Sequence, residues 1–93
     1  MRTFLIIYQL DDYGTDYSNL STYIKNNFEW IKLMQRTWLV KSKKSIKMIR
    51  SELAQVAEKG IKLTVFDVTN SNWSTYAIDP NYNSWMRDNI LPL

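Results

Sequence analysis

Basic side chains gather in one stretch of the sequence. Residues 25–50 carry eight lysines and arginines and a single acid, Glu29, whereas the rest of the chain is acidic overall. This asymmetry indicates a positive surface for an anionic partner. The alternative is an ordinary solvated surface rich in lysine. The residues that we expect to contact phosphate groups are Arg2, Lys41, Lys43, Lys44 and Lys47.

Four of these residues surround the start of the clearest predicted helix, residues 45–59. Ile46, Ile49, Leu53 and Val56 recur in that helix at the spacing of one apolar face. Lysines are unfavourable beside the positive end of a helix dipole, whereas free backbone N–H groups there bind anions. The sequence therefore predicts a phosphate site at the start of this helix.

Aromatic residues are expected beside the basic cluster. The predicted topology brings Arg2 and Trp30 to the same end of the sheet, and a ring beside lysines suits a phosphate with a stacked base. We expect Tyr8 or Trp30 to stack on the ligand. The alternative is that the tryptophans, Trp30 and Trp38 among them, belong to the core or to a contact between subunits.

Catalysis has few candidates in this chain. There is no histidine and no cysteine, which excludes imidazole bases, thiol nucleophiles and Cys/His zinc sites. Asp11 and Asp67 should lie at opposite ends of the sheet, so they cannot share a metal within one subunit. Asp11 and Asp12 could bind one across a two-fold axis, but acidic loop residues usually form solvated turns. We expect no catalytic residue, no metal site and no cofactor.

The positioning elements follow from the hydrophobic pattern. Strands are predicted at 2–10, 30–34, 37–42 and 61–68, and helices at 17–27, at 45–59 and after Asp79-Pro80. Asp16 is the expected N-cap of the first helix, and Gly60 the expected C-terminal cap of the second. The order predicts one α+β domain over 1–93 with a ferredoxin-like βαββαβ fold. Its four-stranded antiparallel sheet, in the order 4-1-3-2, carries two helices on one face, and a short C-terminal helix follows.

The other face of this sheet is predicted to be apolar and uncovered. Leu5, Ile7 and Phe66 point to it, and an exposed apolar face marks an interface. We therefore expect a homo-oligomer, a dimer or larger, built on these residues. The alternative is that the C-terminal helix and the loop around Trp73 fold back over the face.

Several short stretches carry a family resemblance. They are YQL (8–10), YGTDYSNL (13–20), TWLVKS (37–42), SIKMIRSEL (45–53) and the tryptophan of YNSWMRDNIL (82–91). In these the chain resembles small bacterial SinR-family proteins, and through them the second Cas protein of CRISPR adaptation. The resemblance implies a ferredoxin-like fold and a dimer. In the Cas relatives an aspartate near the end of the first strand is associated with a divalent-metal nuclease site. Gln9 stands in the related position here and cannot supply an anionic ligand.

Three functions are compatible with the sequence. The first is a non-catalytic, homo-oligomeric binder of nucleic acid or of a phosphorylated nucleotide, cyclic ones included, with a defence or anti-defence role by analogy. The second is a magnesium-dependent nuclease, and the third is a protein–protein interaction module. The apolar run 4–7 is too short to span a membrane, and no signal peptide is recognisable. We therefore expect a cytoplasmic protein without a membrane partner.

Overall fold

The predicted order of strands and helices is confirmed. The computed structural model of the protein describes residues 1–10 and 18–90, so the predictions for Asp11, Asp12 and Asp16 lie outside the described residues. The elements, in chain order, are β1 (Arg2–Leu10), α1 (Ser18–Asn27), β2 (Glu29–Met34), β3 (Thr37–Ser42), α2 (Ile46–Val56), β4 (Ile61–Asp67) and α3 (Pro80–Asn89). The protein has the expected α+β, ferredoxin-like fold.

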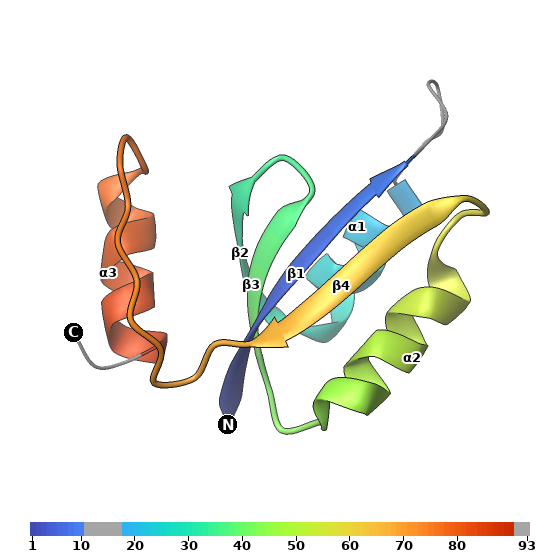
Figure 1. Cartoon of the computed structure of the whole chain (residues 1–93), viewed down its shortest axis with the longest axis horizontal. Coiled ribbons are helices and arrows are strands. Elements are labelled where there is room, and N and C mark those ends of the chain that lie inside the picture. Colours follow the sequence, from blue (N-terminus) through green and yellow to red (C-terminus); the bar gives the residue numbers. More distant parts are fainter. Residues whose placement is uncertain (11–17, 91–93) are drawn as a thin grey trace.

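The four strands form one antiparallel sheet in the order β2-β3-β1-β4. Strand β1 is central and pairs with β3 on one side and β4 on the other, which explains why apolar residues occupy both of its faces. Figure 1 shows three layers, with α1 and α2 on one side of the sheet and α3 on the other.

The main core lies between the sheet and the helices α1 and α2. Alternate residues of β1 point into it, as the period of a strand requires, and each helix adds apolar residues of its predicted face. On α2 these are Ile49, Leu53 and the half-buried Val56, whereas the prediction was wrong for Ile46, which is 38% exposed. The fully buried members are Phe4, Ile6, Leu20, Ile24, Trp38, Val40, Ile49 and Leu53.

A second core lies on the opposite face, under α3. Met86 and Ile90 of α3 pack on Ile31 and Leu39 of the sheet, and Trp73 packs beside them. Hydrogen bonds fix the end of the helix, because the hydroxyl of Thr3 donates to the Asn89 carbonyl at 2.6 Å. The sequence left open that the C-terminal helix folds back over this face of the sheet. That alternative is correct for the half of the face formed by β2 and β3.

The β4 half of that face stays open. Leu5 is half-buried against the second core, so it is largely used within the subunit. Ile7 and Phe66 remain 37% and 51% exposed. Of the three expected interface residues, only these two present substantial apolar surface.

The ends of the helices follow their capping residues. Ser45 is the N-cap of α2, which begins at Ile46 rather than at residue 45. Asp79, with Pro80 at the first helical position, starts α3 as predicted. However, α2 ends at Val56 rather than at residue 59, because Ala57 has an extended backbone. Gly60 has the expected positive φ of 90°, but it serves the turn into β4 rather than the cap of the helix. None of the helices in the described part of the chain has the length and apolarity needed to cross a membrane.

Candidate nucleic-acid interface

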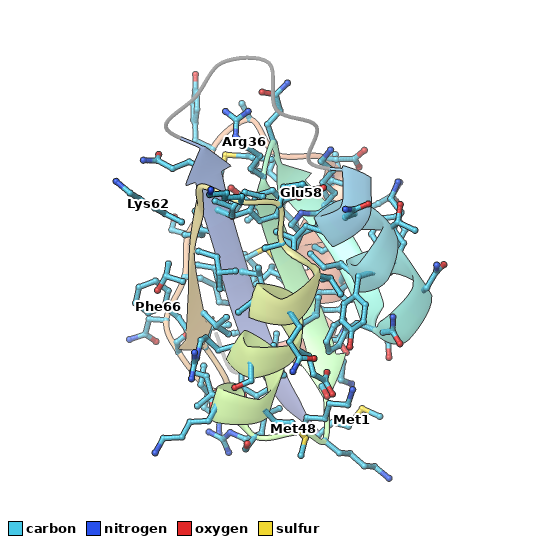
Figure 2. The ribbon with its side chains drawn as sticks, turned by 90° about the vertical axis from the view of Figure 1, so that its right-hand side faces the viewer. Met1, Arg36, Met48, Glu58, Lys62 and Phe66 are labelled. Carbon is cyan, nitrogen blue, oxygen red and sulfur yellow. The ribbon has the colours of Figure 1, made fainter. Side chains whose placement is uncertain are left out.

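The predicted phosphate-binding residues are brought to one end of the sheet. The backbone N–H of Asn19 donates to Glu58 Oε1 at 3.0 Å, so α1 begins beside the end of α2 and ends beside its start. Thr3 is paired with Lys41 and Phe4 with Asp67, so β1 begins at this same end. We call it the basic end; Met1 and Met48 mark it at the bottom of Figure 2.

Arg2 is held by a carboxylate of the neighbouring strand. Its Nε donates to Oδ2 of Asp67, whose other oxygen accepts the N–H of Thr69 at 3.0 Å. Partial burial acts to raise the pKa of Asp67, but the hydrogen bonds from Arg2 and Thr69 outweigh it and hold the pKa below its ordinary value. This contact uses one of the five N–H donors of the guanidinium group, and the side chain is 60% exposed, so the Nη groups of Arg2 can reach a phosphate while Nε stays on Asp67.

Lys44 is also occupied. Its Nζ donates to both oxygens of Glu52, at 3.0 and 2.8 Å, and the hydroxyl of Tyr23 donates to the same carboxylate at 3.0 Å. The hydrogen bond between them raises the pKa of Lys44 and lowers that of Glu52. Burial and then the hydrogen bond to Glu52 raise the pKa of Tyr23. The hydrogen bonds of Lys44, Glu52 and Tyr23 connect the start of α2 to α1, so this lysine stabilises the packing of the two helices.

Three of the predicted lysines lack such a partner. The ion pairs within 4 Å among the described residues are Arg2–Asp67 and Lys44–Glu52. Lys41, Lys43 and Lys47 therefore form no such ion pair there, although Lys41 lies opposite Glu29 in the ladder between β2 and β3. The hydroxyl of Ser45 accepts the N–H of Met48 at 3.1 Å. The first N–H groups of α2 precede any acceptor within the helix.

Two further lysines, which sequence reasoning did not single out, lie over aromatic rings beside this end. Nζ of Lys25 is 5.5 Å from the ring centre of Trp30, and Nζ of Lys32 is 5.4 Å from that of Trp38. The two rings meet edge to face, 5.4 Å apart. In the sequence, the alternation of Trp30 and Lys32 on β2 could have indicated a lysine beside an aromatic ring. That Lys32 covers the ring of Trp38 follows only from the pairing of these two residues across β2 and β3.

The structure separates the two candidate stacking residues. Trp30 is 37% exposed, so its ring is accessible to a ligand at the basic end. Tyr8 is only 3% exposed, and its hydroxyl accepts the indole N–H of Trp38 at 3.2 Å. The prediction that Tyr8 stacks on a ligand is wrong, because that side chain belongs to the main core.

A polar groove of about 480 Å³ lies between α1 and α2. Its lining is rich in carboxamides, which donate and accept hydrogen bonds without adding charge. The groove adjoins Tyr23, whose hydroxyl is bound to Glu52. The lining residues are Asn19, Thr22, Tyr23, Asn26, Asn27, Gln55 and Val56.

Residues 1–10 and 18–90 hold no group of three acidic side chains that could bind a metal ion. Asp67 is paired with Phe4, at the start of β1, whereas Leu10 is paired with Ile61. The carboxylate of Asp67 is thus far along the sheet from the end of β1 and is used by Arg2.

Compared with known proteins, the chain matches no family model, no curated protein and no solved structure. The similarity to SinR-family proteins and to the second Cas protein therefore stays a prediction. The function has to be argued from the side chains of the chain itself.

Proposed function

We propose that the protein is a non-catalytic, homo-oligomeric binder of nucleic acid or of a phosphorylated nucleotide. The observation that carries this proposal is that several lysines without an ion pair in the described part of the chain lie at the same end of the sheet as the exposed ring of Trp30. Lys25 lies over that ring, while Lys41, Lys43 and Lys47 surround the start of α2 at the same end. Positive charge beside an accessible ring suits an unpaired base and its phosphate.

Replacement of the Lys25 ammonium group by a nucleic-acid base on the Trp30 ring is energetically favourable. A lysine over an exposed ring contributes about 0.5–1 kcal/mol, whereas a stacked base contributes about 1–3 kcal/mol. A base can therefore displace Lys25 from the ring, and the released ammonium group then reaches the adjoining phosphate. Lys32 lies over the buried ring of Trp38 and extends the positive surface along β2.

The start of α2 supplies the second half of the proposed site. Lys43 and Lys47 are exposed and form no ion pair with a described carboxylate, so they are the lysines we expect to contact phosphate. Arg2 and Lys44 contribute to the positive potential from their ion pairs. The carboxamide groove between α1 and α2 offers groups that hydrogen-bond to the edges of bases.

The test is a fluorescence titration with single-stranded DNA, single-stranded RNA, a DNA duplex and a panel of cyclic and linear nucleotides at two salt concentrations. We expect wild type to bind at least one ligand with a steep salt dependence. The double variant Lys43→Glu, Lys47→Glu should abolish that binding. Its matched control is Lys59→Glu, Arg87→Glu, which changes the net charge equally on exposed residues of other surfaces.

Three outcomes would contradict the proposal. Failure of wild type to bind any member of the panel would remove the binding function and leave the protein-docking alternative. Equal loss of binding in both double variants would mean that net charge, not this site, attracts the ligand. Cleavage of a nucleic acid with Mg²⁺ or Mn²⁺ would show that the protein is a nuclease.

A further inference from the structure

The two edges of the sheet differ in how well they are protected. The edge strand β2 is six residues long, and its register with β3 shifts between Lys32 and Met34. A lysine and an irregular register are the usual means by which proteins blunt an edge. The opposite edge, β4, keeps an uninterrupted register with β1 over all seven of its residues. No strand in the described part of the chain pairs with the outer side of β4, so β4 presents a regular edge.

The ladder shows which backbone groups of β4 face outward. The N–H of Val68 donates to the Thr3 carbonyl at 2.9 Å, and residues alternate along an antiparallel ladder between those that bond to the neighbour and those that do not. The even-numbered residues of β4 therefore bond to β1. The N–H groups of Leu63, Val65 and Asp67 point away from the sheet.

We infer that β4 pairs with β4 of a second copy of this chain, antiparallel about a two-fold axis at Thr64. In this register Leu63 lies opposite Val65 of the second copy, and Ile61 lies opposite its Asp67. Leu63, Val65 and Asp67 of each copy then donate to outward carbonyls of the other. The N–H of Ile61 is already bound to the Glu58 carbonyl, so Ile61 only accepts. Two four-stranded sheets become one continuous sheet.

The side chains of β4 are complementary to themselves in this register. Phe66 and Lys62 project from the outer side of β4, away from α2 (Figure 2). The two-fold axis puts Phe66, which is 51% exposed, opposite Lys62 of the second copy, where an ammonium group can lie over the ring. On the helix side, the half-buried Leu63 and Val65 extend the main core across the axis.

Shifting the two-fold axis by one residue separates Phe66 from Lys62 of the second copy. Centring the axis on Leu63 places Phe66 opposite Gly60, and centring it on Val65 places Phe66 opposite Thr64, so neither register gives the ring a lysine partner. Antiparallel pairing about Thr64 also puts the two basic ends at opposite ends of the joined sheet. The repulsion between like charges of the two copies is then as small as this edge allows.

The mass of the protein in solution, by light scattering at tens of micromolar, tests the interface. Wild type should be a dimer, and Phe66→Lys should weaken the dimer at least tenfold because two ammonium groups then face each other. Phe66→Glu should stay dimeric, since the new carboxylate faces Lys62 of the second copy. The swap Lys62→Glu, Phe66→Lys should restore the dimer that the single Phe66→Lys variant loses.

A disulfide provides a second readout of the same register. Residue 64 would face its own copy as a non-hydrogen-bonded pair, whose Cα separation of about 4.5 Å lies within the range that a disulfide spans. The natural chain has no cysteine, so Thr64→Cys should give covalent dimer on oxidation while Ser51→Cys, exposed on α2, should not. A monomeric wild type, or equal dissociation of Phe66→Glu and Phe66→Lys, would overturn the inference. Neither result depends on binding of nucleic acid.

Discussion

The ammonium group of Lys44 donates to both carboxylate oxygens of Glu52, at 3.0 and 2.8 Å. The two residues lie on either side of the first turns of α2, and Tyr23 joins them from α1. The contact explains why a lysine is tolerated beside the positive end of a helix: its charge is directed to a carboxylate further along the same helix. It also keeps this lysine away from a ligand.

The first prediction concerns stability against pH. The pKa of Glu52 is lowered in the folded state, so its contribution is present above the ordinary glutamate pKa of about 4.3 and is lost as the pH falls through the lowered folded value. Solvent screens the pair, so we expect Glu52→Gln to cost about 0.5–1 kcal/mol at pH 7. Thermal melts should show a difference in Tm that disappears in acid. Asp88→Asn, which removes the same charge from an exposed residue of α3, should leave Tm unchanged.

The same substitution should strengthen binding. Without its carboxylate partner, Lys44 becomes free to contact a phosphate, so Glu52→Gln should tighten nucleic-acid binding although it destabilises the fold. One additional phosphate contact should steepen the slope of log K against log salt by about 0.7–0.9. The measurement is a salt titration of affinity, with Asp88→Asn, exposed on α3, as the control for net charge. An unchanged slope would mean that Lys44 does not reach the ligand.

The third prediction concerns the exposed ring at the basic end. Removal of the ring in Trp30→Ala should cost about 1–3 kcal/mol of binding to single-stranded nucleic acid, whereas Trp30→Phe should keep most of the affinity. Tyr76→Ala is the matched control, since Tyr76 is 93% exposed on the loop before α3 and should not matter. Circular dichroism checks that the fold survives loss of the contact between Trp30 and Trp38. Binding that is indifferent to Trp30→Ala would exclude stacking there.

The fourth prediction concerns the start of α1, which is capped from another part of the chain. Oε1 of Glu58 accepts the N–H of Asn19, while Oε2 is buried and has no hydrogen-bond partner among residues 1–10 and 18–90. Loss of a helix cap costs about 0.5–2 kcal/mol, so Glu58→Ala should lower the free energy of unfolding in urea by about 1 kcal/mol. Glu58→Gln retains an oxygen that can accept the N–H of Asn19. Its free energy of unfolding should therefore lie between those of wild type and Glu58→Ala. A neutral Glu58→Ala would show that this cap does not stabilise α1.

The fifth prediction tests the packing of α3. Met86 is almost fully buried on the sheet, and truncation of a buried methionine costs about 2–5 kcal/mol. Met86→Ala should therefore lower the urea midpoint strongly, whereas Met86→Leu should cost less than about 1.5 kcal/mol. Comparable stability of Met86→Ala and wild type would mean that α3 adds little to the fold.

Local patterns in the sequence determined the elements of this protein. The alternation in β1, the apolar stripe of Ile49 and Leu53, and the Asp79-Pro80 start of α3 each depend on neighbours a few residues away, so they predict a strand or a helix directly. The order of these elements then restricted the topology to the ferredoxin-like sheet. The basic residues could be assigned to one end of that sheet for the same reason.

Only the tertiary structure decided what each side chain does. Tyr8 and Trp30 are both aromatic residues on strands, yet one is buried under the helices and the other lies at an exposed edge. Lys44 and Lys43 are adjacent, but only Lys44 finds a carboxylate, eight residues away. Whether α3 covers the second face depended on long-range contacts of Thr3 and Ile31 with the C-terminal helix. Such partners come from distant parts of the chain, so exposure and pairing are properties of the packed fold that local sequence patterns do not encode.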